Sequence, residues 1–174
     1  MRLNGFEGTD APAEVVWATR LSPVTARVEN IPTPATRFRF GDVVLHDGAA
    51  NGTRLFASGD ERPVFDVFEV FELSDYITFD VHLIAPRSEA IEELEAACEA
   101  ADVQVEDWTK SMRVLCKACS EGRPHEQHDH SLKNDEWQIE RRVGFASKDE
   151  AKVNAVLEHW ETQDKERRVE SLDS

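Results

Sequence analysis

The sequence contains no long hydrophobic run. No segment approaches the roughly 18 consecutive apolar residues that a membrane-spanning helix needs, and residues 1–11 have no hydrophobic stretch of the kind found in a secretion signal. We therefore expect a cytoplasmic protein with no membrane as its partner. Because 40% of the residues are hydrophobic, including four Trp and nine Phe, the chain can still bury a core.

Basic residues are scarce throughout the chain. Twenty Lys and Arg stand against 35 Asp and Glu, which gives a formal net charge of −15. Residues 1–75 contain seven basic and twelve acidic residues, and residues 76–174 contain thirteen and twenty-three. Proteins that bind nucleic acid neutralise phosphates with Lys and Arg, so this balance argues against DNA or RNA and favours a basic protein partner. The alternative is that acidity only keeps the protein soluble.

Motifs of common enzyme classes are also missing. The sequence has no glycine-rich phosphate-binding loop and no Gly-x-Ser-x-Gly nucleophile motif. Acidic residues are abundant but scattered, so no pair of carboxylates is indicated as catalytic. We interpret the isolated His46, His82 and His159 as structural. The sequence therefore predicts no catalytic residues.

Cysteines are few, and two of them lie beside a cluster of histidines. Three cysteines cannot form an even disulfide framework, and a Cys-x-x-Cys pair next to His residues is typical of a metal site. Zn²⁺ prefers four sulfur or nitrogen ligands in a tetrahedron. The sequence therefore predicts a structural zinc site in the loop 116–130, formed by Cys116 and Cys119 with two of His125, His128 and His130.

Three other interpretations of this loop remain open. It is either a His-rich loop that binds metal only in vitro, a redox-active Cys-x-x-Cys pair, or an open zinc site of a hydrolase with water as the fourth ligand. The spacing from His125 to His128 is one residue too short for the His-Glu-x-x-His motif of zinc proteases. Five available ligands favour a closed structural site instead.

Residues 1–75 have the pattern of a β-rich domain. Apolar and β-branched residues dominate 14–21, 24–31 and 64–71, and the Pro-Thr-Pro sequence at 32–34 interrupts them. Asp-Gly and Asn-Gly pairs at 47–48 and 51–52 are typical of tight turns. We predict a small antiparallel β-barrel or curled sheet.

Residues 76–174 alternate between strand and helix patterns. Strands are predicted at 76–85, 103–116, 136–146 and 168–172. A helix is predicted at 89–101, with Ile91, Leu94, Cys98 and Ala101 on its buried stripe. A second helix follows a capping box at 147–150, and its buried positions are Val153, Val156, Leu157 and Trp160. This order predicts a ferredoxin-like α/β sandwich, and an α+β fold for the whole chain.

Two resemblances accompany these patterns. The segments 16–21, 27–32 and 41–44 read VWATRL, RVENIP and GDVV. Residues 14–75 thereby resemble an uncharacterised bacterial domain family with a VWA…YRVDNIPF…GDVV opening, from which they depart at Thr33 and Pro34. In element order, length and charge the second half resembles the B-type regulators of ribonuclease E, small acidic ferredoxin-like proteins. That resemblance implies a module that acts by binding an enzyme.

These observations favour a non-enzymatic, acidic protein-binding module stabilised by zinc. Acidic surfaces attract basic partners, and inhibitors of nucleic-acid enzymes present carboxylates where phosphates would bind. We therefore expect an immunity protein or an inhibitor that neutralises a basic toxin or nuclease. The exposed glutamates of the helix 89–101 are the expected contacts. The alternative is a zinc-dependent hydrolase that uses the same Cys/His loop.

Overall fold

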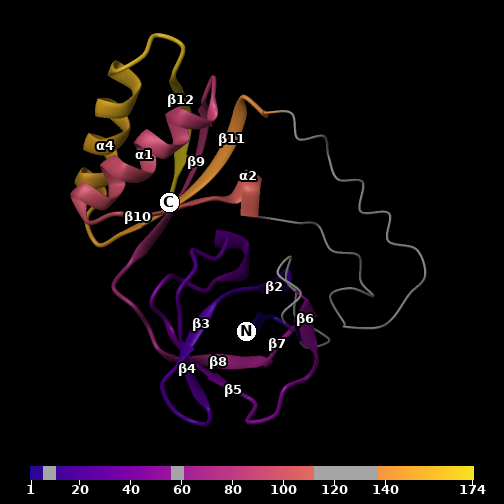
Figure 1. Cartoon of the computed structure of the whole chain (residues 1–174). Helices are drawn as coiled ribbons and strands as arrows, with labels where there is room; N and C mark the ends of the chain where they lie inside the picture. Colours follow the sequence, from indigo (N-terminus) through magenta and orange to yellow (C-terminus); the bar gives the residue numbers. More distant parts are fainter. Residues whose placement is uncertain (6–10, 56–60, 112–136) are drawn as a thin grey trace.

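The structure, a computed structural model, describes residues 1–5, 11–55, 61–111 and 137–174 (Figure 1). It combines helices with antiparallel sheets, and no sheet among these residues closes into a barrel. The strands of the first half lie together at one end of the molecule, and the larger helices and their sheet lie at the other (Figure 1). No helix in the described ranges is long and apolar enough to cross a membrane.

The first half is built from short strands around a four-stranded antiparallel sheet. In this sheet β3 (Ala18–Arg20), β4 (Thr25–Val28), β5 (Val43–His46) and β8 (Val67–Glu72) lie in that order. There are also two antiparallel two-stranded sheets. One pairs β1 (Arg2–Leu3) with β2 (Glu14–Val15), and the other pairs β6 (Thr53–Leu55) with β7 (Glu61–Pro63). A short 3-10 helix, η1, covers Pro34–Thr36.

Of the two alternatives predicted for residues 1–75, a barrel or a curled sheet, the barrel is wrong for the described part of the chain. β6 pairs with β7, and β1 pairs with β2. Apart from one isolated bridge between Arg2 and Asp66, these four strands are not joined to the main sheet. The register between β5 and β8 also shifts twice, and such bulges bend a strand away from regular pairing. The remaining open sheet packs one face on a small core of Leu3, Val16, Ala26, Val28, Phe38, Val44 and Val67.

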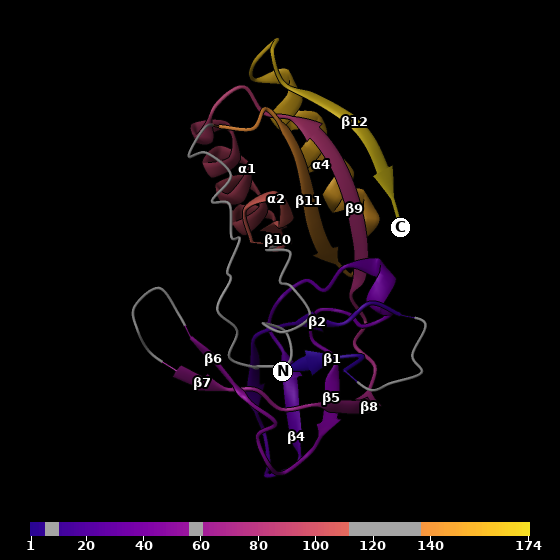
Figure 2. The same ribbon diagram turned by 90° about the vertical axis from the view of Figure 1, so that its right-hand side faces the viewer.

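The second half is a two-layer sandwich. Its antiparallel sheet has the order β10 (Gln104–Asp107), β11 (Glu140–Ser147), β9 (Ile77–Ile84), β12 (Arg168–Asp173). The helices α1 (Ser88–Ala101) and α4 (Glu150–Thr162) lie on the same face of this sheet (Figure 2). Strand, helix, strand, strand, helix and strand thus follow one another as the apolar patterns predicted.

The core of the sandwich confirms both predicted helix stripes. Ile91, Leu94 and Cys98 of α1 are buried and Ala101 is partly buried against the same core, and all four predicted positions of α4 are buried as well. They pack against alternate residues of the central strands, namely Phe79, Val81, Leu83, Val143 and Phe145. The intervening residues of these strands face away from the helices, which gives the sheet a second, helix-free face.

Two local predictions are wrong. The strand expected at 103–116 ends at Asp107, and the chain turns into the short helix α2 (Trp108–Ser111) because Asp107 Oδ1 accepts a hydrogen bond of 3.1 Å from the Thr109 N–H. The N-cap of α4 is Asp149, whose side chain accepts from Ala151 N–H at 3.0 Å. Ser147, the N-cap of the predicted capping box, instead accepts from the Asp149 N–H at 3.1 Å, before the helix begins.

Candidate functional site

The five predicted zinc ligands, Cys116, Cys119, His125, His128 and His130, lie outside the described residues. The strands on either side of that segment are described, and β10 and β11 are antiparallel neighbours with Asp107 opposite Val143. The insertion therefore leaves and re-enters the sheet on adjacent strands, as predicted. Within the described ranges, no group of three or more His, Cys, Asp or Glu side chains could hold a metal ion.

A buried ion pair holds together the strands at the base of this insertion. Arg141 of β11 donates to the carboxylate of Asp107 at the end of β10, and each side chain is less than one tenth exposed. The Arg141 guanidinium also lies 4.3 Å from the ring centroid of Trp137, whose Nε1–H donates to the Ala85 carbonyl at 2.8 Å. The chain is thus held by specific contacts at Asp107 before the insertion and at Trp137 and Arg141 after it.

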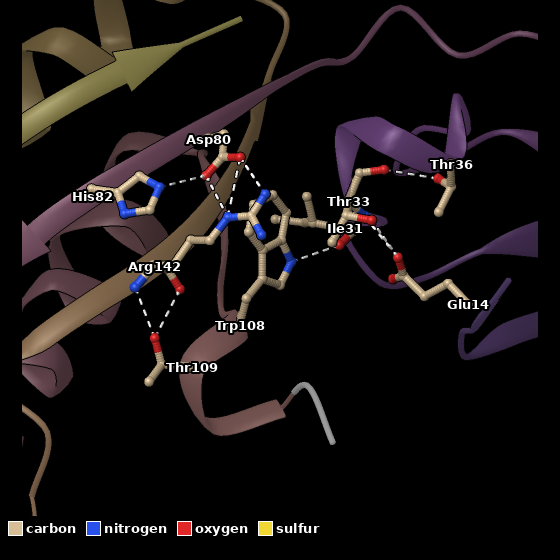
Figure 3. Close-up of polar contacts among 9 residues, drawn as sticks. All are labelled: Glu14, Ile31, Thr33, Thr36, Asp80, His82, Trp108, Thr109 and Arg142. Atoms are coloured by element: carbon tan, nitrogen blue, oxygen red, sulfur yellow. Dashed lines mark hydrogen bonds and ion pairs between the residues drawn. The ribbon is translucent and has the colours of Figure 1, made fainter. Parts of the chain in front are cut away.

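Trp108 joins the two halves of the chain. Its Nε1–H donates to the Ile31 carbonyl at 2.9 Å (Figure 3). Ile31, Trp108 and Ala146 form a buried cluster. Glu106 makes the second link, because its carboxylate accepts from the Ile31 N–H at 2.9 Å and from the Asn30 amide at 3.2 Å. The helix-free face of the sheet is therefore partly covered by the first half.

A charged cluster on the same face continues from Trp108. Arg142 donates from Nε to Asp80 Oδ1 at 2.9 Å and from Nη2 to Oδ2 at 2.5 Å (Figure 3). Hydrogen bonds to Asp80 and the charge of that carboxylate raise the pKa of Arg142. The guanidinium also lies 5.2 Å from the Trp108 ring centroid, and His82 Nε2 lies 3.8 Å from Asp80. Asp80 therefore holds Arg142 in place over the ring.

Glu14 brings a third carboxylate to this junction. Its Oε2 accepts from the Thr33 hydroxyl at 2.7 Å and from the Thr33 N–H at 3.1 Å (Figure 3). Burial raises the pKa of Glu14, and the negative charge of Glu106 adds to this, while the hydrogen bonds from Thr33 and the charge of Arg142 oppose it. A carboxyl with a raised pKa is a common feature of functional sites.

The chemistry of the junction is nevertheless that of a structural contact. Asp80, Glu106 and Glu14 each already accept hydrogen bonds from groups of this chain. The hydroxyls of Thr33, Thr36 and Thr109 are engaged as well, with Glu14, the Thr33 carbonyl and the Arg142 N–H respectively. The arrangement fixes Trp108 and Glu106 of the second half against Ile31 of the first half.

The sequence alone did not reveal this junction. Asp80 and Arg142 were two of many scattered charges, and His82 was interpreted as isolated. One usable signal was present, because Arg142 and Gly144 alternate with Val143 and Phe145 on a strand whose other face is apolar. Polar or very small residues at such positions indicate that something other than a helix covers that face.

The outer face of α1 is acidic. Its glutamates are all exposed, and they are Glu89, Glu92, Glu93, Glu95 and Glu99. The helix contains no Lys or Arg, and among the described residues only Glu93 of this face forms an ion pair, with Arg167. This face is the one that the sequence predicted as the contact with a partner.

The chain matches no protein-family model, no curated protein and no solved structure. The two resemblances seen in the sequence therefore have no support beyond the residues that carry them. Function must be inferred from the charges and contacts of this chain itself.

Proposed function

We propose that this chain is a non-enzymatic, acidic protein-binding module that neutralises a basic toxin or nuclease, as an immunity protein or an inhibitor. The observation that carries the proposal is the outer face of α1, with five exposed glutamates and no cation in the helix. The net charge of −15 adds a long-range attraction for a basic partner.

The spacing of these glutamates is unfavourable for the helix itself. Glu89 and Glu93 are four residues apart, and so are Glu95 and Glu99. Like charges at this spacing cost about 0.2–0.5 kcal/mol per pair. A partner that supplies Lys or Arg would relieve this repulsion, which gives the arrangement a use in binding.

The helix is also held rigidly, which suits recognition. Leu94 and Cys98 are fully buried, and Trp160 Nε1–H donates to the Ala90 carbonyl at 2.6 Å. Because the backbone is fixed, binding of a partner does not have to order the helix itself.

The topology is consistent with the same proposal. A β-α-β-β-α-β order with the sheet order β10, β11, β9, β12 is that of a ferredoxin-like sandwich, and we assign the second half to that class. Acidic modules of this design include the B-type regulators of ribonuclease E, which the second half resembles. Binding to an enzyme in the cytoplasm is therefore the mode of action that we propose.

Zinc is part of this proposal as a structural ion. Cys116 and Cys119 with two of His125, His128 and His130 would complete a four-ligand site, which leaves no position for a catalytic water. The buried pair of Asp107 and Arg141 supports this role, because it fixes the two strands from which the insertion starts.

A pull-down from the native host tests the function. Wild-type protein should retain a basic protein at low salt and release it at high salt, because screening weakens the attraction. The variant Glu92→Lys/Glu99→Lys should lose that partner, whereas Glu158→Lys/Glu170→Lys, which changes the charge equally on exposed residues elsewhere, should keep it. Recovery of no partner, or of acidic proteins only, would overturn the proposal.

A further inference from the structure

Three consecutive triplets of the same type occupy residues 64–72. Each consists of Val, Phe and an acidic residue, and together they read VFD, VFE and VFE. The structure treats the first triplet differently from the other two. Phe65 and Asp66 are 8% and 3% exposed, whereas Phe68 and Phe71 are 58% and 64% exposed.

The first triplet is covered by arginines of the chain itself. The guanidinium carbon of Arg20 lies 5.0 Å from the ring centroid of Phe65. Arg2 donates from Nε to the Asp66 carboxylate at 2.5 Å. In the first triplet, therefore, one arginine covers the phenyl ring and another pairs with the neighbouring carboxylate.

The Phe and Glu residues of the second and third triplets are exposed because the strand is bulged. In the pairing of β8 with β5, Val67 lies opposite His46 and Glu69 opposite Leu45, which leaves Phe68 as an extra residue. Phe71 is the extra residue between Val70 and Glu72 in the same way. The valines turn toward the core, and both Phe-Glu pairs stay on the surface.

We propose that Phe71 and Glu72, together with Glu69, bind an extended, arginine-bearing segment of a partner protein. One arginine stacks on the ring of Phe71 while a neighbouring one pairs with a glutamate, which repeats the contacts of Phe65 and Asp66. The inference rests on the proposed function for the basic nature of the partner. It adds a surface that is separate from α1.

Charge and strand geometry favour this occupant over others. A second copy of the chain would bring another acidic surface against Glu69 and Glu72, and like charges repel. Pairing of a partner strand along the edge of β8 is disfavoured because bulges disrupt the ladder of backbone hydrogen bonds. A partner segment can therefore bind here through side-chain contacts with the exposed Phe and Glu residues of β8.

The test uses the full-length, isotope-labelled chain and a synthetic nonapeptide of alternating Arg and Ser, with the Lys-Ser version as its counterpart. The arginine peptide should shift the backbone amide signals of residues 67–73 and bind at least about threefold more tightly than the lysine peptide. Phe71→Leu, which keeps an apolar side chain but removes the ring, and Glu72→Gln should each weaken binding at least about threefold.

Glu158→Gln on α4, an exposed residue outside both proposed surfaces, is the matched control and should leave the peptide affinity unchanged within about 1.5-fold. Because the substituted side chains are exposed, the melting temperature of each variant should stay within about 2 °C of wild type. Shifts confined to α1, equal binding by Phe71→Leu, or a dimer that Phe71→Leu dissociates would each overturn the β8 surface. The pull-down from the native host would still test the proposed function, because that experiment does not depend on the β8 surface.

Discussion

The indole ring of Trp108 lies so close to Gly144 that a Cβ on the glycine would overlap the ring atoms Cε2 and Cζ2. Trp108 follows β10, and Gly144 lies on the neighbouring strand β11, on the face without helices. The absent side chain of the glycine is what allows the ring to lie there and to reach the Ile31 carbonyl of the first half.

Gly144→Ala should therefore loosen the junction of the two halves. The added methyl group displaces the ring, and overpacking of this kind costs about 1–3 kcal/mol in the free energy of unfolding. Urea unfolding followed by tryptophan fluorescence measures the loss. Gly48→Ala is the control, because nothing lies within 4 Å of its added Cβ, and it should be close to neutral. Equal effects of the two substitutions would contradict the role of Trp108.

Asp107→Ala should be one of the most destabilising substitutions of a charged residue. It leaves the Arg141 guanidinium buried without its carboxylate, and breaking a buried pair in this way costs about 3–5 kcal/mol. Asp75→Ala removes a partner from the exposed pair with Lys148 and should change stability by less than about 1 kcal/mol. The double variant Asp107→Ala/Arg141→Met should recover part of the lost free energy of unfolding, as measured by chemical denaturation. If the double variant is no more stable than Asp107→Ala, the loss does not come from an uncompensated charge on Arg141.

Asp66 should make the stability of the chain depend on acid pH. Burial would raise the pKa of Asp66, but hydrogen bonds from Arg2 and Asn51 and the charge of Arg2 outweigh it and lower the pKa. The ionised carboxylate thus stabilises the fold above its unfolded-state pKa of about 3.9, and this contribution is lost as the pH falls through the lower folded-state value. Asp66→Asn should cost about 1–3 kcal/mol at pH 7, and the difference from wild type should shrink below about pH 4.

Glu14 should depend on pH with the opposite sign. Burial, with the charge of Glu106, raises its pKa, so the folded chain binds a proton at higher pH than the unfolded chain does. Wild type should therefore gain stability relative to Glu14→Gln as the pH falls from 7 toward about 4.3. Unfolding curves at four or five pH values check both residues, and parallel curves for wild type and both variants would refute the two assignments.

Metal analysis tests the proposed zinc site. Untagged, freshly purified protein should contain about one zinc per chain, because Cys116 and Cys119 with two histidines complete one tetrahedral site. Cys116→Ser should lose the metal, while Cys98→Ala should keep it, since Cys98 is buried in the core between α1 and the sheet. A wild-type protein without bound transition metal would remove the site from the proposal.

The thiol of Cys98 should be unreactive in the folded chain. Burial raises its pKa to about 12, with a smaller contribution from the negative charge of Glu95, so the thiolate that reacts with labelling reagents is scarce at pH 8. In the variant Cys116→Ser/Cys119→Ser, where Cys98 is the only cysteine left, a thiol reagent should label the chain in urea and not in native buffer. Rapid labelling of the native variant would show that α1 opens from the sheet.

The repeat of apolar residues was enough to predict the sandwich elements. Ile91, Leu94 and Cys98 fall on one stripe of α1, and Val153, Leu157 and Trp160 fall on one stripe of α4, because helical periodicity depends on local sequence alone. Phe79 and Phe145 lie on strands that were predicted for the same reason. The closing strand β12 was also expected.

Long-range contacts were beyond the reach of that pattern. The end of β10 at Asp107 depends on Trp108, whose position is set by Gly144 and by Ile31, 36 and 77 residues away along the chain. The bulges of β8 likewise depend on its pairing with β5, so the exposure of Phe71 could not be read from the triplet.

By itself, the sequence determined the strong negative charge, the order of strands and helices in the second half, and the residues that these helices bury, because each follows from composition or local periodicity. Only the tertiary structure decided that the first-half sheet stays open, that Asp80 and Arg142 meet on the helix-free face, and that Trp108 joins the halves. These features require atoms distant in sequence to come within a few ångströms, and no local pattern encodes which distant residues will meet.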